Sequence, residues 1–257
     1  MIVRTAEERA GVIEAGKRLG VILEELAKAV RPGVTTRELD ALAEKMIRDD
    51  GDEPAFKGFK PDGARVPFPA ATCISVNDEV VHGIPSDRVL KEGDIVSLDL
   101  GLIHKGFIMD SALTVAVGTI SPIAQKLMNA TETALAVAID VARPGARVGD
   151  ISYATQTAFS GTGFSIVKVL GGHGVGAAVH EEPFIANAGH AGTGPEIVSG
   201  MVLALEPIAT TGKGAVFIAP DGYTYRTKDG SLAAHFEHTI LIENNETLIL
   251  TKRPSED

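Results

Sequence analysis

The sequence predicts a single α+β domain built from two similar halves. The order helix, Arg-Pro-Gly, helix, then strands occurs twice, with the tripeptide at Arg31-Pro32-Gly33 and again at Arg143-Pro144-Gly145. In each half an apolar run ends on a carboxylate, first at Asp99 and then at Glu206. Because 257 residues suit one α/β domain, we expect a domain over 1–257 with pseudo-repeat halves of about 1–118 and 119–257.

Apolar residues at helical spacing predict the helices of both halves. The Thr35-Thr36-Arg37-Glu38 segment matches a capping box, and Ser121-Pro122 starts an Ala-rich helical pattern. The two Arg-Pro-Gly segments supply stops. The expected helices run from Ala6 to Val30, from Thr35 to about Asp50, from Ser121 to Val141 and from about Asp150 to Ala158.

β-rich segments follow the helices in both halves. The Gly93–Asp99 segment aligns with Gly200–Glu206 without a gap, and Asp110–Val115 mirrors Glu237–Ile242. Each half therefore offers two acids from neighbouring strands, in a repeat too weak and too long for a solenoid. The predicted β-rich segments are Thr72–Val81, Ile95–Val117, Phe164–Val169 and Val202–Leu250.

Composition restricts the functional classes. Hydrophobic residues at 44% and charged residues at 23% are typical of a soluble globular protein. The net charge of -10 and the lack of a basic cluster disfavour nucleic-acid binding. A single cysteine fits a reducing compartment, so we expect a cytoplasmic protein. Charged residues interrupt the region of a secretory signal and no run is long enough for a bilayer, so export and membrane insertion are not expected.

The four strand-borne acids are the strongest chemical feature of the sequence. A single carboxylate at a strand end is ordinarily solvent-exposed. Asp99, Asp110, Glu206 and Glu237 occupy two pairs of equivalent positions flanked by hydrophobic residues. Burying four acids together would require cations to offset their repulsion, and paired divalent ions roughly 3.5–4 Å apart are a common hydrolytic arrangement. We therefore predict a site for two divalent metal ions.

His173 is the candidate imidazole ligand of that site. It lies in the Gly171–Gly176 segment, where glycines on both sides allow close backbone packing. The segment lacks a Lys-Ser/Thr ending and does not match G-x-G-x-x-G, so a phosphate loop is rejected. No His-Glu-x-x-His helix and no Gly-x-Ser-x-Gly elbow occurs, which removes the usual mononuclear-zinc and serine-hydrolase motifs.

Four segments resemble those of methionine aminopeptidases in order and spacing. They are Val80–Pro85, Gly172–Gly176, Leu205-Glu206-Pro207 and Phe236–Thr239. The resemblance covers nearly the whole chain and implies peptidase family M24 and its pita-bread fold, a curved antiparallel sheet covered by helices. Without a long insertion or an N-terminal domain, the chain is similar to type I. This implies metal-dependent removal of an N-terminal methionine when the second residue is small.

The same resemblance implies roles for the site residues. Asp110 and Glu237 would bridge both ions, Asp99 would chelate one of them, and His173 and Glu206 would complete the other. A hydroxide between the ions would attack the first peptide carbonyl, with Glu206 as general acid and base. One imidazole and four carboxylates can bind Co, Mn, Fe or Zn, so these four metals are alternatives.

Further residues resemble substrate-contacting positions of the family. His82 and His180 match two histidines that contact the substrate near the scissile bond, although a lone loop histidine is ordinarily structural. We expect both to be catalytic as well as substrate-binding. Cys73 is similar to a residue that lines the methionine pocket, and an ordinary core cysteine is the alternative.

The pocket departs from the family pattern in several places. The Lys57–Pro69 segment looks longer than in familiar bacterial enzymes, with Phe59 and Phe68 in place of tyrosines. Tyr223 stands where several relatives have tryptophan, and Val179 stands where phenylalanine is frequent. We expect Phe59, Phe68 and Tyr223 to bind substrate. The remaining histidines are interpreted as structural or exposed, and strand alternation turns His238 away from Glu237; they are His104, His190, His235 and His238.

Two alternative functions stay open. Aminopeptidase P, prolidase and creatinase relatives resemble this chain around the metal residues, and they usually carry an extra N-terminal domain. A catalytically silent homologue that binds peptides, the ribosome or other proteins is the second. The main resemblance implies a monomer that acts on nascent polypeptides or short peptides with an N-terminal methionine, with contact to the ribosome left open.

Overall fold

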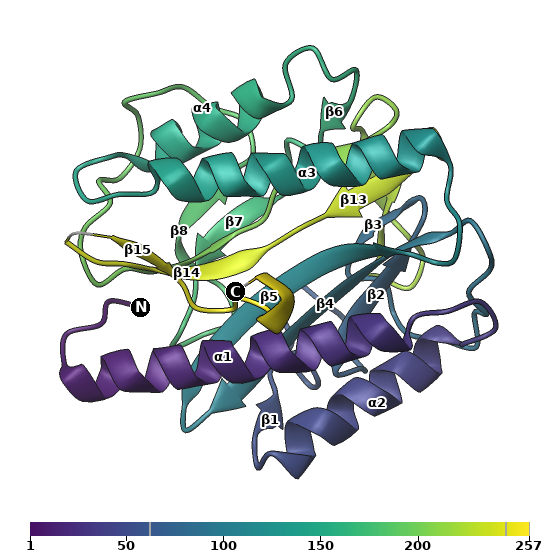
Figure 1. The fold of residues 1–257 in the computed structure, drawn as a ribbon, viewed down its shortest axis with the longest axis horizontal. Coiled ribbons are helices and arrows are strands. Elements are labelled where there is room, and N and C mark those ends of the chain that lie inside the picture. Colours follow the sequence, from purple (N-terminus) through teal and green to yellow (C-terminus); the bar gives the residue numbers. More distant parts are fainter. Residues whose placement is uncertain (62, 245, 257) are drawn as a thin grey trace.

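The computed structural model describes every residue except 62, 245 and 257, so that part of the Lys57–Pro69 prediction that concerns Asp62 lies outside the described residues. The described chain contains helices and antiparallel strands joined by loops (Figure 1). The helices are α1 (Ala6–Ala29), α2 (Thr36–Asp49), α3 (Pro122–Val141), α4 (Val148–Ala158) and the 3-10 turn η1 (Pro254–Glu256).

Capping side chains set the starts of the three long helices. Thr5 and Thr35 each accept a hydrogen bond from the amide of a glutamate three residues later, Glu8 and Glu38, whose carboxylate bonds back to the cap amide. Ser121 caps α3, and the proline that follows it opens the helix. The predicted boundaries of α1, α2 and α3 are confirmed, because these capping signals are local in sequence.

The strands pair antiparallel throughout the described residues. They are β1 (Glu53–Pro54), β2 (Thr72–Val76), β3 (Glu79–Val81), β4 (Ile95–His104), β5 (Phe107–Ala116), β6 (Ser165–Ile166), β7 (Gly171–Gly174), β8 (Glu181–Ala186), β9 (Val202–Leu205), β10 (Ile208–Thr210), β11 (Val216–Ile218), β12 (Tyr225–Thr227), β13 (Ala233–His235), β14 (His238–Ile242) and β15 (Thr247–Ile249). The Phe164–Val169 prediction was too long, since only β6 forms there.

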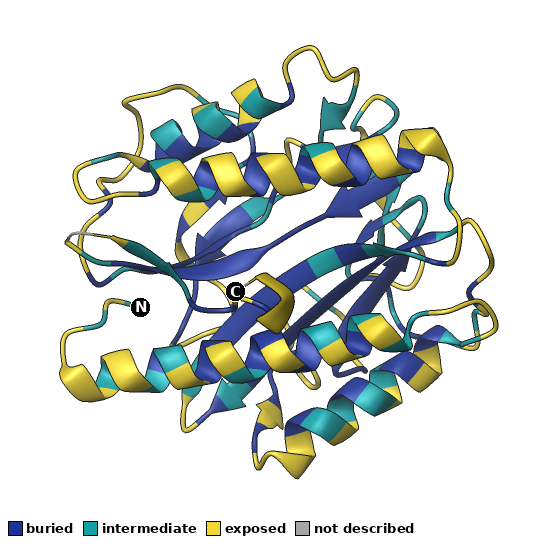
Figure 2. Ribbon diagram, viewed as in Figure 1, coloured by how far each residue is buried: buried dark blue, intermediate teal, exposed yellow. Residues whose placement is uncertain are grey.

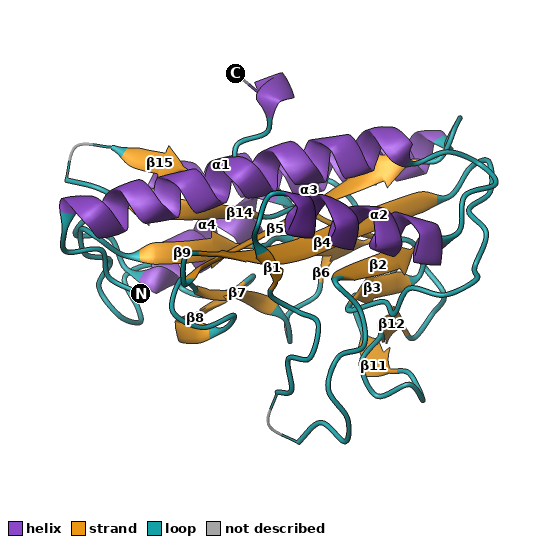
Figure 3. Cartoon of the chain, turned by 90° about the horizontal axis from the view of Figure 1, so that it is seen from below, coloured by secondary structure: helices purple, strands orange, loops and turns teal. Residues whose placement is uncertain are grey.

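The largest ladders place the site-bearing strands side by side. In one sheet β4 pairs with three strands. It pairs with β1 and β2, and it forms a ten-residue ladder with β5. In another the order is β15-β14-β9-β7-β8. Two three-stranded sheets, β13-β10-β6 and β11-β12-β3, complete the pairing. Helices α1, α2 and α3 cover one side of the strands, and long loops extend from the other (Figure 3).

Two hydrophobic clusters hold the helices on the strands. One packs α1 and α2 on β4 and β5, with Leu19, Leu23 and Leu98 fully buried. The other packs α3 and α4 on β9 and β14, around Leu127 and Ile240. Burial follows the inward faces of these helices, and their outer faces stay exposed (Figure 2). No helix of the described chain is both long and apolar enough to cross a membrane.

The two large ladders are joined where Glu237 meets β5. The Glu237 amide donates to Ala112 O at 2.8 Å, and Ser111 Oγ donates to Glu237 O at 2.8 Å. This contact brings Asp110 and Glu237 next to each other although 127 positions separate them in the chain. The acids of the first and second halves thereby share one location.

Candidate metal centre

Every site residue predicted from the sequence lines one cavity, next to the contact between Glu237 and β5. Its lining contains apolar, acidic and imidazole side chains from both halves. They are Phe56, Phe59, Pro61, Phe68, Cys73, Val81, His82, Asp99, Asp110, His173, Val179, His180, Glu206, Tyr223, His235 and Glu237.

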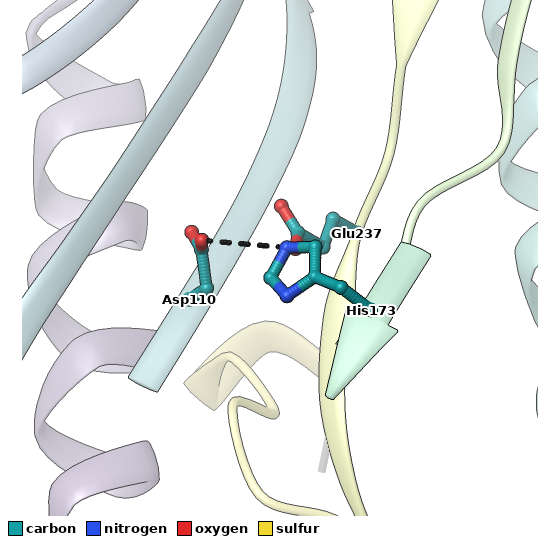
Figure 4. A group of neighbouring side chains, drawn as sticks. All are labelled: Asp110, His173 and Glu237. Carbon is teal, nitrogen blue, oxygen red and sulfur yellow. Dashed lines mark ion pairs between the residues drawn. The ribbon is translucent and has the colours of Figure 1, made fainter. Parts of the chain in front are cut away.

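Three ligand-type side chains converge most closely (Figure 4). One ligand atom from each of Asp110, His173 and Glu237 lies within 4.8 Å of the others. His173 Nε2 is 4.0 Å from Asp110 Oδ2 and 3.7 Å from Glu206 Oε1. His173 Nδ1 lies 2.9 Å from Gly174 O, so the proton resides on Nδ1 and the Nε2 lone pair faces the acids. That tautomer is the one that can bind a metal through Nε2.

The acids are buried without enough partners to hold their charge. Asp99, Asp110 and Glu237 are 8%, 4% and 2% exposed, and an oxygen of each lacks a hydrogen-bond partner within the described chain. Burial raises the pKa of Asp99 to about 7. Burial and the neighbouring acids also raise the pKa values of Asp110, Glu206 and Glu237. Cations would offset both effects, so the donor set fits divalent metal.

Glycines allow the close packing that places His173. A Cβ on Gly172 would lie 2.2 Å from Ala204 O, and one on Gly174 would lie 2.4 Å from Glu182 O. Both distances are far inside van der Waals contact, so larger residues would separate β7 from β9 or β8. The prediction that glycines serve close backbone approach at His173 is confirmed. The segment forms strand β7, which the sequence did not indicate.

His82 and His180 both line the cavity, and different contacts fix them: backbone hydrogen bonds around His82 and ring contacts of His180. The His82 backbone is left-handed, with φ of 58°. This conformation costs about 1–3 kcal/mol, and it persists because contacts with the surrounding structure offset the cost. Thr224 Oγ1 lies 3.3 Å from His82 O, and the Gly83 amide donates to Ser75 Oγ at 3.0 Å. Burial, followed by the nearby His180, lowers the His82 pKa to about 4, so its imidazole is neutral at pH 7.

The His180 ring stands almost perpendicular to two neighbours. Its centroid is 4.6 Å from that of His173 and 5.6 Å from that of Phe59. Partial desolvation beside the cavity lowers the His180 pKa from its ordinary value, although the residue remains exposed to solvent. His180 thus contacts both sets of lining residues. Its ring meets His173 of the acidic end, which we define as Asp99, Asp110, His173, Glu206 and Glu237, and Phe59 of the aromatic end, which we define as Phe59, Phe68 and Tyr223.

Comparison with known proteins assigns the chain to a family. The model of metallopeptidase family M24 matches residues 10–244. A methionine aminopeptidase of Aquifex aeolicus (strain VF5) is 46% identical over 93% of this chain and 94% of its own length. The chain belongs to the methionine aminopeptidase family. Methionine aminopeptidase 1 of Bacillus subtilis (strain 168) is 43% identical over 98% of this chain and 99% of its own.

Solved structures confirm the predicted pita-bread fold of this family. The crystal structure of methionine aminopeptidase from Thermotoga maritima superposes with a TM-score of 0.93 at 41% identity, covering 98% of this chain and all of that one. A prolidase from Pyrococcus horikoshii OT3 shares the fold at a TM-score of 0.73 and 22% identity, and this chain covers 64% of it. This chain is therefore a member of a family of metal-dependent peptidases.

Phe59, Phe68, Val179 and Tyr223, where the sequence predicts departures from the family pattern, all line the cavity. Phe68 and Tyr223 meet edge to face with centroids 5.2 Å apart, and the Tyr223 hydroxyl donates to Val66 O. Cys73 faces Asp99 across the β2–β4 ladder. Burial, and then the charge of Asp99, raises the pKa of the Cys73 thiol, which disfavours a thiolate. Cys73 thus lines the cavity wall next to the acids.

His235 was missed by the sequence analysis. It is 2% exposed and lines the cavity, with Nε2 3.5 Å from Glu206 Oε2. Strand alternation could have predicted its position. Residues two apart in an extended segment share a face, and His235 is two residues before Glu237. His238 points the other way, toward Thr251, as alternation predicts. His104 is buried against Asp52, away from the cavity, and His190 is exposed.

Proposed function

We propose that this chain removes N-terminal methionine from polypeptides and peptides whose second residue is small. One observation carries the proposal: the buried Asp99, Asp110, His173 and Glu237 and the partly buried Glu206 line the same cavity as the aromatic side chains of Phe59, Phe68 and Tyr223. The acidic end suits hydrolysis, and the aromatic end suits a long, flexible thioether. Full-length similarity to methionine aminopeptidases supports the same reaction.

The metal-holding residues are those that share the acidic end. Two divalent ions, of Co, Mn, Fe or Zn, would be held by Asp99, Asp110, His173, Glu206 and Glu237, with Asp110 and Glu237 in the role of shared ligands. When bound, the ions supply a nucleophile from water at neutral pH and polarise the scissile carbonyl. The orphaned oxygens of Asp99, Asp110 and Glu237 support this assignment.

Glu206 moves the proton in the proposed reaction. Its carboxylate accepts a proton from the attacking water and returns it to the leaving amine. In the metal-free protein burial and Asp99 raise the pKa of Glu206, and bound cations would oppose that rise and favour the ionised carboxylate that acts as the base. His82 and His180, both with lowered pKa values, orient the peptide as neutral hydrogen-bonding groups beside the scissile bond.

Methionine selection is assigned to the aromatic end. The substrate side chain would pack against Phe59, Phe68, Cys73 and Tyr223, while the space for the second residue excludes large side chains sterically. We further propose a cytoplasmic monomer that acts on nascent chains. The buried, unpaired Cys73 and the net charge of -10 support a reducing compartment and a non-nucleic-acid substrate respectively.

Peptide competition tests this function. Protein loaded with Co²⁺ or Mn²⁺ is expected to cleave Met-Ala-Ser in preference to Xaa-Pro peptides. Glu206→Gln should lower kcat by roughly 10²–10⁴-fold, whereas exposed Glu196→Gln should behave like the wild type. Preference for Xaa-Pro peptides would favour a prolidase-like enzyme. A metal-loaded wild type without activity would favour the silent homologue, and activity indifferent to chelation and to Glu206→Gln would contradict the mechanism.

A further inference from the structure

The backbone of His235 is fixed from the neighbouring ladder. Its amide donates to Thr114 Oγ1 at 2.9 Å, and Thr114 Oγ1 donates to His235 O at 2.8 Å. Ser97 Oγ lies 2.8 Å from the same hydroxyl, and because the Thr114 proton is used by His235 O, Ser97 is the donor. β4 and β5 thus hold His235 at the end of β13.

The His235 ring is oriented between two acids and lacks other partners. Neither ring nitrogen has a hydrogen-bond partner among the residues that the structure describes, and the side chain is 2% exposed. Nε2 lies 3.5 Å from Glu206 Oε2 and 3.7 Å from Glu237 Oε2. Both distances exceed a hydrogen bond by a few tenths of an ångström. A small movement of either carboxylate would give this buried nitrogen a partner.

We propose that His235 is a positioning residue for the metal centre, whose single Nε2–H is shared between the Glu206 and Glu237 carboxylates. The inference rests on the proposed function. Holding Oε2 of each acid on the imidazole leaves Oε1 free to face the ions. Carboxylates that bind metals are generally oriented by such outer hydrogen bonds. His235 would therefore couple the proton-moving Glu206 to the bridging Glu237, through a side chain that binds no metal itself.

Cobalt binding to the metal-free protein tests this role without relying on activity. Calorimetric titration with Co²⁺, together with the visible absorption of the bound ion, reports affinity and ligand geometry. His235→Leu should weaken Co²⁺ binding by about 10–100-fold and change the spectrum. His235→Gln, whose longer amide can still donate, should restore most of the affinity, and the shorter His235→Asn should not.

His104→Gln is the matched control, since His104 is also buried and bonds Asp52 at 2.7 Å away from the cavity. It should alter thermal unfolding but leave Co²⁺ binding unchanged. If His235→Leu does not fold, the comparison of Gln with Asn decides the matter. Wild-type affinity in His235→Leu, or equal weakness of the Gln and Asn variants, would overturn the positioning role.

The same titration separates this role from the proposed function. Wild-type protein that binds Co²⁺ but leaves Met-Ala-Ser intact would contradict methionine removal, while the contrast among the His235 variants would still decide the positioning role. Wild-type protein that binds no Co²⁺ would overturn both.

Discussion

The hydroxyl of Thr239 satisfies both backbone groups of Asp110. Thr239 Oγ1 donates to Asp110 O at 2.7 Å and accepts from the Asp110 amide at 3.2 Å. Thr239 is fully buried on β14, and Asp110 is on β5, so this pair joins the two large ladders directly beside the acids. The location of Asp110 thus depends on a side chain from the other half of the chain.

Thr239→Val should destabilise the protein because it leaves two buried backbone groups of Asp110 without partners. We expect a loss of about 1–3 kcal/mol in the free energy of unfolding of the metal-free protein, measured in urea. Thr133→Val is the control, because its hydroxyl bonds Asn129 O on the exposed side of α3. Equal stability of the two variants would show that the Thr239 bonds contribute little.

Metal should stabilise the wild type and not a bridging-acid variant. A ligand at 100 times its Kd adds about 2.7 kcal/mol to folding, so Co²⁺ should raise the Tm and chelation should reverse the rise. Asp110→Asn removes one of the repelling buried acids. Its metal-free Tm should equal or exceed that of the wild type, while Co²⁺ should raise it much less. The exposed Asp140→Asn should retain the full metal response, and a full response in Asp110→Asn would refute the assigned ligand.

Phe59→Ala should weaken selection of methionine. Phe59 contacts the His180 ring and lines the cavity. Loss of an apolar contact of this size corresponds to about 1.5–3 kcal/mol, so kcat/KM for Met-Ala-Ser should fall by roughly 10–100-fold, mainly through KM. Phe217→Ala removes a phenylalanine that is 43% exposed on β11 and should change neither parameter. An unchanged KM in Phe59→Ala would remove Phe59 from the methionine pocket.

Gly172→Ala should disturb His173 through the backbone. The added methyl would meet Ala204 O at 2.2 Å, so β7 must move away from β9 at a cost of about 1–3 kcal/mol. We expect a lower Tm together with weaker Co²⁺ binding. In Gly11→Ala the three atoms nearest to the added methyl belong to the side-chain ring of Phe107, which can move, so metal binding should stay normal. Normal binding in Gly172→Ala as well would show that β7 tolerates the shift.

Sequence patterns predicted much of the fold and of the site. Capping boxes at Thr35 and the Ser121-Pro122 start placed the helices, because caps act over three or four residues. The acids ending the strands predicted a shared site, and the cavity brings them together. Division of the chain into duplicated halves stays a prediction, although the two hydrophobic clusters divide the helices in the same way.

Long-range pairing accounts for what was not predicted. Strand β7 contains three glycines, which have low strand propensity, and it forms because β8 and β9 lie on either side of it. The strand predicted over 164–169 shortens to β6, which pairs with β10 at the edge of its sheet. His235 was not predicted as a site residue because its only local signal was the two-residue spacing to Glu237.

Local sequence therefore determined the helices, the strand-borne acids and the choice of His173, since periodicity, caps and residue chemistry are written in short windows. Tertiary structure alone decided that Asp110 lies next to Glu237 and that His235 faces Glu206. The first contact depends on the hydrogen bonds from Thr239 to Asp110 and from Ser111 to Glu237, which join β14 and the residue before it to β5. The second depends on the hydrogen bond from the His235 amide to Thr114, which fixes the end of β13 against β5. These hydrogen bonds of Thr239, Ser111 and Thr114 join residues more than 100 positions apart, and no short window of the sequence contains a signal for them.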